Sequence, residues 1–476
     1  MNICAKLRII LFILFSAVLS QFSMGQKTGH QIIVHIPEMK DTTCFLANYY
    51  GDKQYIVDTV RSDRNGTAVF NGKKMLPGGI YLFVFPDKHY FEMIVDREQY
   101  FTIETSWSDP IRDMKVKDSR DNQLFYDYLR TAIELQRKSL KWDDSLKVAK
   151  TKEDSSNLRE QTKKNEEELM AYREKYLSDY PETFLAKVFK SMPEPEIPKE
   201  TPTLPNGKKD SLFAYHYFKD HFLDNIDFQD SRLLRTPILG SKLKKYIQDI
   251  TPQIPDSIDK AADLVVAKAK GDSEVFKYVV WWITYTYETS KIMGLDAVFV
   301  HMVENYYIPG QAYWMDSASL SKITDRARKI APNLIGSTAP EIALKDSIGN
   351  WEILSKVPAK FTILVFWDPD CSHCQKEIPK LKHVTDSLKK NGSDLKVYAI
   401  DIEVEESKWK KFIRDNKLGD WINVNDAQHL SNFRQLYDIY STPVIYILDE
   451  KKVIRAKRIS VEQIPELLDR LGKGKI

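Results

Sequence analysis

Two cysteines separated by two residues, Cys371 and Cys374, are the clearest candidates for chemistry in this 476-residue chain. They lie between an apolar run at 361–367, which predicts a strand buried on both faces, and the segment 374–389, whose apolar residues recur every three or four positions and predict a helix. Unpaired N–H groups in the first turn of a helix, together with the helix dipole, favour a thiolate over a thiol. The spacing therefore predicts a redox pair in which the more exposed Cys371 attacks and the buried Cys374 resolves the mixed disulfide.

The same cysteine pair could instead be half of a zinc site. The next cysteine towards the N-terminus is Cys44, and the chain has no His-x-x-x-His pair. A closed zinc shell needs four ligands, so these residues favour redox chemistry and no bound metal. Cys44 itself lies in a strand-like run, where a lone cysteine is typically a small buried hydrophobe.

The residues around the pair resemble the thioredoxin superfamily, and within it the TlpA/ResA-like thiol:disulfide oxidoreductases of the cell envelope. The matching residues are Phe366-Trp367 before the pair, Glu377 and Pro379 after it, and the later run Ser441-Thr442-Pro443-Val444. The resemblance covers roughly the last 140 residues, about one domain. It implies disulfide exchange with protein substrates through a Cys371–Cys374 disulfide, without a separate cofactor.

The resemblance also implies roles for single residues. Glu377 would take and return the proton of the resolving Cys374. Thr442 and Pro443 would form a cis-proline loop that offers its backbone to an extended substrate peptide, and Trp367 would also contact substrate. These roles are expectations carried over by position.

His373 stands between the two cysteines, next to Ser372. As an imidazolium or a hydrogen-bond donor it would lower the pKa of Cys371 and make the disulfide more oxidising. This dipeptide departs from the proline before the second cysteine that is common among TlpA/ResA-like proteins and is closer to that of DsbA, so the direction of exchange stays open. Asp368 stands three positions before Cys371, where a peroxiredoxin has threonine or serine, so the sequence does not predict a peroxiredoxin site.

The first 25 residues predict a secretory signal peptide. Two basic residues precede an apolar core at 9–19, and Ser23 and Gly25 occupy the −3 and −1 positions of a cleavage site. The core is shorter than the roughly 20 residues that span a bilayer. We therefore expect cleavage near Gly25 and a periplasmic mature chain with no transmembrane segment.

The remaining chain divides by its pattern into three domains. Residues 26–108 predict an all-β, sandwich-like domain, because short β-branched and aromatic runs alternate with turn signals. Residues 109–330 predict an all-α domain with long amphipathic helices at 124–148 and 155–177 and a proline-rich loop near 193–205. Residues 331–476 predict an α/β thioredoxin-like domain. The expected β strands of the first domain are 31–36, 44–50, 54–60, 67–71, 80–85, 90–95 and 100–104.

Within the last domain the pattern predicts a mixed sheet with helices on both faces. Further strands are expected at 395–402, 444–448 and 453–458. Further helices are expected at 407–416, 430–437 and 461–471.

These observations predict an exported thiol:disulfide oxidoreductase that exchanges with protein substrates and with an envelope electron donor or acceptor. The order of domains resembles exported multidomain proteins of Bacteroidota. An alternative is an envelope binding or scaffold protein with a regulatory redox domain, and a narrower version of the enzyme is a reductase for cytochrome maturation. Lys and Arg (70) nearly balance Asp and Glu (67), so no basic field favours nucleic acid as a partner.

Overall fold

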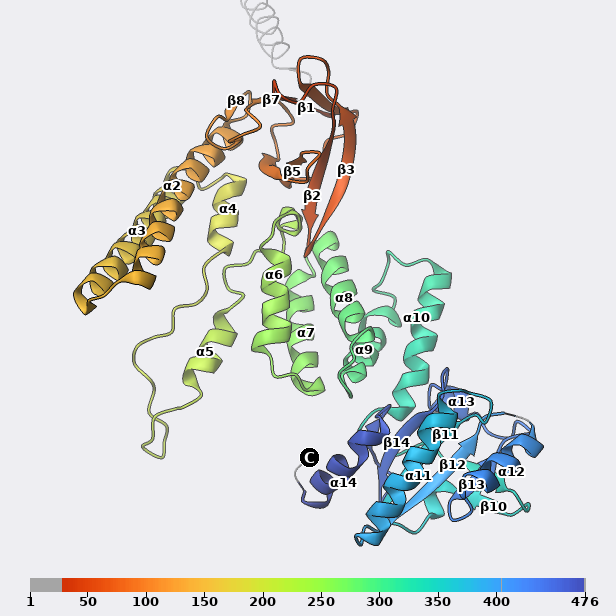
Figure 1. Ribbon diagram of the computed structural model, residues 1–476. Coiled ribbons are helices and arrows are strands. Elements are labelled where there is room, and N and C mark those ends of the chain that lie inside the picture. The colour runs from red at the N-terminus through yellow and green to blue at the C-terminus, as the bar shows by residue number, and fades with distance from the viewer. Residues whose placement is uncertain (1–27, 404, 475–476) are drawn as a thin grey trace, which may run out of the picture. The chain divides into compact units, whose positions relative to one another are not determined.

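The computed structural model describes residues 28–403 and 405–474 (Figure 1). The chain divides into two compact units, with the division between Tyr246 and Ile247. The predicted signal peptide, residues 1–25, lies outside the described residues, as does Gln26, the expected first residue of the mature chain. Each unit is considered by itself below.

The first unit begins with two four-stranded sheets, in the orders β4-β1-β7-β8 and β3-β2-β5-β6. All seven predicted strands are present. Alternating residues bury one face of β1, β4 and β7, whereas β5 is buried along nearly its whole length and β3 is mostly exposed. Phe70 of one sheet packs edge-on against Phe83 of the other, with ring centroids 6.1 Å apart, so the β sandwich is confirmed. The eighth strand was not predicted, because it is only three residues long and two of them are lysines. The strands are β1 (His30–His35), β2 (Thr43–Tyr50), β3 (Lys53–Arg61), β4 (Thr67–Gly72), β5 (Gly79–Val84), β6 (Tyr90–Val95), β7 (Tyr100–Glu104) and β8 (Lys115–Lys117).

The helices that follow in this unit begin with the two long ones expected from the sequence, α2 (Arg120–Val148) and α3 (Lys152–Asp179). Each starts at a residue whose hydroxyl accepts a backbone N–H of the first turn, Ser119 and Thr151 respectively. The proline-rich segment 193–205, all of it described, holds no helix, as predicted. Three shorter helices complete the unit: α4 (Phe184–Ser191), α5 (Phe213–His221) and α6 (Leu239–Lys244).

The second unit opens with helices α7 (Pro255–Ala269), α8 (Ser273–Glu288), α9 (Asp296–Met302) and α10 (Ser317–Ile330). The apolar stretch 278–287 lies in α8 and is largely buried, as expected for a helix in a packed domain. Among the described residues, no helix is long and apolar enough to cross a membrane.

The redox domain is built on a seven-stranded mixed sheet in the order β10-β9-β13-β12-β11-β14-β15. The central strand β11 is buried along its whole length, runs parallel to β12 and is antiparallel to β14. One face of the sheet packs on α11, α12 and α14, and the other on α13, so helices on both faces are confirmed. The strands are β9 (Ala343–Asp346), β10 (Trp351–Ile353), β11 (Phe361–Trp367), β12 (Leu395–Asp401), β13 (Ile422–Asn425), β14 (Val444–Asp449) and β15 (Ile454–Lys457). The helices are α11 (Cys374–Lys390), α12 (Glu406–Asp415), α13 (Phe433–Leu436) and α14 (Ile464–Gly472).

Two details of this domain differ from the prediction. The helix expected at 430–437 shrinks to the single turn α13, because the carboxylate of Asp426 accepts the backbone N–H groups of Leu430 and Ser431 at 2.6 and 3.1 Å and closes a loop there. Strand β13 was not predicted, because it is four residues long with asparagine at its second and fourth positions and has little apolar pattern.

Candidate redox site

The cysteine pair lies where β11 ends and α11 begins, as the sequence predicts. A tight turn separates them from the strand: the Asp368 side chain accepts the N–H of Asp370 at 2.7 Å, and its carbonyl accepts the N–H of Cys371 at 3.2 Å. Cys374 is the first residue of α11 and is fully buried, whereas Cys371 is partly exposed. Both thiols are free. The sulfur that a substrate can reach is therefore that of Cys371.

The surroundings of Cys371 favour its thiolate. Partial burial acts to raise the pKa of the Cys371 thiol. Other contacts outweigh burial and hold the pKa below its ordinary value of 9.0. They come from the backbone N–H of Cys374, Thr442, the Cys374 side chain and the backbone N–H of His373. The Cys371 Sγ lies 3.5 Å from the carbonyl oxygen of Thr442, within hydrogen-bond reach of the thiol.

The surroundings of Cys374 have the opposite effect. Burial raises the pKa of this thiol to about 12, against smaller lowering contributions from Thr442 and from the backbone N–H of Asp368. The thiols of Cys371 and Cys374 therefore have different pKa values although they lie in one short segment. That difference suits a nucleophile paired with a resolving thiol.

The peptide bond between Thr442 and Pro443 is cis, so the expected cis-proline loop is present. It immediately precedes β14, which pairs with β11, the strand that leads to the cysteines. The contact from Cys371 Sγ to the Thr442 carbonyl places this loop beside the reactive sulfur.

Comparison with known proteins gives matches to the part of the chain that carries this site. The AhpC/TSA family matches residues 335–457. A crystal structure described as a domain of a possible thiol-disulfide isomerase from Cytophaga hutchinsonii is 45% identical, covering 30% of this chain and 97% of that one, with a TM-score of 0.28. The C-terminal domain belongs to the AhpC/TSA family. The AhpC/TSA domain is thioredoxin-like, and the protein is a thiol-disulfide oxidoreductase of the TlpA/ResA kind.

Two further relatives match the AhpC/TSA domain. The thiol-disulfide oxidoreductase ResA of Geobacillus kaustophilus is 25% identical over 121 residues, which are 25% of this chain and 67% of that protein. The thioredoxin domain of a thiol-disulfide oxidoreductase from Bacteroides vulgatus is 28% identical, covering 29% of this chain and 96% of that one, with a TM-score of 0.27. Upstream, two domains of unknown function, DUF4369 and DUF5106, match residues 30–125 and 148–333.

Trp367 was expected to contact substrate, and the structure corrects this. Its side chain is fully buried at the end of β11 and packs against Phe412 of α12, with ring centroids 4.7 Å apart. A ring enclosed in the core of the AhpC/TSA domain packs between β11 and α12 and cannot contact a substrate. The sequence shows that Trp367 precedes the cysteines, but not that the last residue of the strand is this deep.

The structure places His373 and Glu377 without testing their predicted roles. His373 is exposed at the start of α11. Its backbone N–H is one of the groups that lower the pKa of Cys371. Glu377 lies in the first turn of α11, and its side chain is only 15% exposed. Its carboxylate accepts a hydrogen bond from the Lys380 ammonium at 2.7 Å. An imidazole effect on Cys371 and proton exchange with Cys374 both stay predictions.

Asp401 is a charged residue near the site that was not singled out from the sequence. It is fully buried at the end of β12, where it pairs in register with Trp367. Burial, helped by the charge of Asp368, raises the pKa of Asp401 to about 7 against the hydrogen bonds it accepts from the Glu403 N–H and the Asn425 side chain. An aspartate that ends an apolar strand, next to the strand that leads to the cysteines, is the signal that could have identified it.

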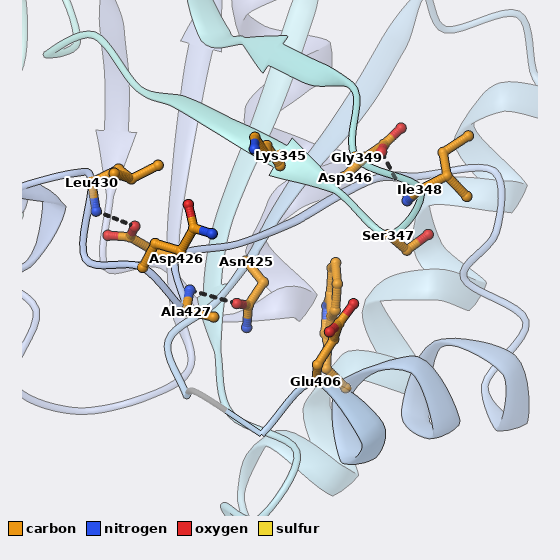
Figure 2. Close-up of a pocket in the computed structure, with 12 residues that line it drawn as sticks. Lys345, Asp346, Ser347, Ile348, Gly349, Glu406, Asn425, Asp426, Ala427 and Leu430 are labelled. Atoms are coloured by element: carbon orange, nitrogen blue, oxygen red, sulfur yellow. Dashed lines mark hydrogen bonds between the residues drawn. The ribbon is translucent and has the colours of Figure 1, made fainter.

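A cavity of about 310 Å³ in the AhpC/TSA domain is separate from the cysteines (Figure 2). It is formed by the β9–β10 turn, the start of α12 and the segment after β13. Figure 2 shows that polar groups around it are satisfied locally: Asp346 accepts the N–H of Ile348, Asn425 that of Ala427, and Asp426 that of Leu430. None of the predicted site residues lines it. Across residues 28–403 and 405–474 no group of three or more His, Cys, Asp or Glu side chains is placed to hold a metal ion.

Proposed function

We propose that the protein exchanges disulfides with protein substrates through the Cys371-Ser-His-Cys374 site. In the reducing direction the Cys371 thiolate attacks one sulfur of a substrate disulfide, which forms a mixed disulfide and releases the other substrate sulfur as a thiolate that takes up a proton. Cys374 then loses its proton and attacks the Cys371 sulfur, which releases the second substrate thiolate. Two electrons pass from the dithiol to the substrate, and the oxidising direction is the same sequence reversed.

The observation that carries this proposal is the difference between the two thiols. An attacking sulfur must be ionised and reachable, whereas a resolving sulfur must stay protonated until the mixed disulfide has formed nearby. Cys371 is partly exposed with a lowered pKa, and Cys374 is fully buried with a pKa of about 12. The adjacent cis-proline loop, in which Thr442 and Pro443 are partly exposed, supports the proposal that an extended peptide binds there through its backbone.

Insulin reduction by the full chain, with dithiothreitol as the electron source, tests this function. We expect the protein to accelerate precipitation of the insulin B chain, and a Cys371→Ser variant to show only the rate of dithiothreitol alone. A scaffold protein with a regulatory redox domain would show no turnover in the wild-type chain. That result would favour the scaffold over the enzyme acting on protein disulfides.

We also propose that the protein is exported and acts in the periplasm, on the strength of its signal-like first 25 residues. The expected mature chain begins at or near Gln26. Intact-mass analysis of the protein recovered from cells checks this. A chain that keeps residues 1–25, or carries a lipid on a cysteine, would contradict it.

A further inference from the structure

Helix α9 and the turn that follows α10 are joined to the AhpC/TSA domain by a buried polar network, although both lie outside the segment that matches this family. The Lys457 ammonium, on a side chain only 4% exposed, pairs with Asp296 of α9 and donates to the Asn333 side-chain oxygen at 3.0 Å. The Asn333 side-chain amide donates to the carbonyl of Leu436 at 3.0 Å. These contacts reach the last residue of α13, just before the segment that leads to the cis-proline.

Arg326 of α10 extends this connection to the residues just before the cis-proline. Its guanidinium lies 3.2 Å from Asp438 Oδ1, and the two residues are 112 positions apart in the sequence. Arg458 pairs with the other oxygen of the same carboxylate at 2.9 Å. The Asp438 side chain is only 7% exposed, so two guanidiniums from different elements enclose one buried carboxylate.

The backbone at this carboxylate has an unusual conformation. Asp438 has φ of 51° and Arg458 φ of 54°, both in the left-handed region that non-glycine residues adopt rarely. Such residues persist where surrounding contacts hold them in place. Here the side-chain pair of Asp438 and Arg458 links one left-handed residue to the other, and Arg326 adds a third contact from outside the domain.

The same two guanidiniums also hold an exposed tyrosine. Tyr440 is 67% exposed, and the guanidinium carbons of Arg458 and Arg326 lie 4.6 and 5.4 Å from its ring centroid, within the range of cation–π attraction. Tyr440 is two residues before Thr442, whose carbonyl meets the Cys371 sulfur. A large exposed side chain is thus held by two cations, two residues along the chain from the residue that contacts the reactive thiol.

A purely structural role for Arg326 explains less of this arrangement. Arg458 already neutralises the buried Asp438, and the Arg326 side chain is 36% exposed, so its ion pair contributes little to global stability. Its two contacts, to Asp438 and to Tyr440, both fall on the segment 438–442. The effect of Arg326 is therefore concentrated on the chain that enters the cis-proline loop.

We propose that Arg326 is a positioning residue for protein substrates: by holding Asp438 and Tyr440 it fixes the segment 438–442, so the upstream helical region forms part of the substrate-binding side of the redox site. This rests on the proposed disulfide exchange with proteins. Arg326 does not touch the cysteines. Its effect should appear in substrate binding and leave the reactivity of the Cys371 thiolate unchanged.

The test compares Arg326→Ala with Arg328→Ala in the full chain. Arg328 is on the same helix, is 67% exposed and pairs only with Asp325 one turn away, so it is a matched control. For Arg326→Ala we expect KM for insulin to rise roughly three- to tenfold with kcat nearly unchanged, the range expected for the loss of one ordinary, partly exposed hydrogen bond. Arg326→Lys, which keeps a cation within reach of Asp438, should recover part of the KM.

Two measurements keep the proposal separate from the proposed function. Exchange with the small disulfide DTNB, which does not need the loop, should proceed at the wild-type rate in both variants. Amide hydrogen exchange across residues 438–442 should quicken in Arg326→Ala only, whether or not insulin is a substrate. Unchanged hydrogen exchange in 438–442, or equal losses of DTNB and insulin activity, would overturn the role of Arg326. A wild-type chain inactive on insulin but with the expected hydrogen-exchange difference would instead count against the proposed function alone.

Discussion

Replacing Cys374 with serine should turn the protein into a trap for its substrates. Without a resolving thiol, the mixed disulfide on Cys371 has no intramolecular route to break down and accumulates. Mass spectrometry under non-reducing conditions should show adducts attached through Cys371 that disappear on addition of dithiothreitol. The effect is expected to be nearly all-or-none, because the step that is removed is the one that releases substrate.

Two matched variants control this experiment. Cys371→Ser should trap almost nothing, because Cys374 is fully buried and its pKa is about 12. The double variant should match it, which would show that Cys44 does not react, since burial raises the pKa of that thiol to about 11. Adducts on Cys374 in the Cys371→Ser variant, at the level seen on Cys371 in Cys374→Ser, would reverse the assigned roles.

The elements that carry the site could be predicted because their signals are local. The apolar run at 361–367 and the three-to-four spacing after Cys374 specify a buried strand followed by an amphipathic helix, and β11 and α11 have nearly the predicted bounds. The seven β strands between residues 30 and 104 follow from short runs of β-branched and aromatic residues and from the turn residues between them. The expected Thr-Pro loop also proved to contain a cis bond.

The depth and pairing of side chains could not be predicted in the same way. The residues next to a tryptophan in the sequence do not show whether its ring is exposed to substrate or buried in the core. Trp367 was therefore predicted to contact substrate, although it is buried. The helix expected at 430–437 failed because one side chain, Asp426, offers the backbone an alternative to helical hydrogen bonds. Both errors depend on contacts that the sequence pattern does not contain.

The contribution of the upstream helices to the site was also invisible in the sequence. Arg326 looks like an ordinary charged residue on a solvated helix face, and its partner Asp438 is far away along the chain. The burial of Asp401 could not be identified from the sequence for the same reason. Its buried position depends on the pairing of β11 with β12 and on the hydrogen bond from Asn425. Ion pairs and buried carboxylates formed over long sequence separations require the tertiary structure.

The central claim is that the two active-site thiols differ in acidity, and the pH dependence of alkylation tests it. A pKa below 9.0 for Cys371 and about 12 for Cys374 differ by more than three units, so below both values the thiolate population of Cys371 exceeds that of Cys374 more than about 1,000-fold. A less basic thiolate is also less nucleophilic, with a Brønsted coefficient of about 0.5, which reduces the expected ratio of rates to at least about 30.

The measurement follows iodoacetamide modification of each cysteine in the reduced full chain by peptide mass spectrometry between pH 5 and 10. Because the pKa of Cys371 is lowered, its rate should rise with pH through a midpoint below pH 9, while the rates of Cys374 and Cys44 stay low and continue to rise. A Cys371 rate at least about 30 times that of Cys374 at neutral pH agrees with the account. Equal rates, or faster labelling of Cys374, would contradict it.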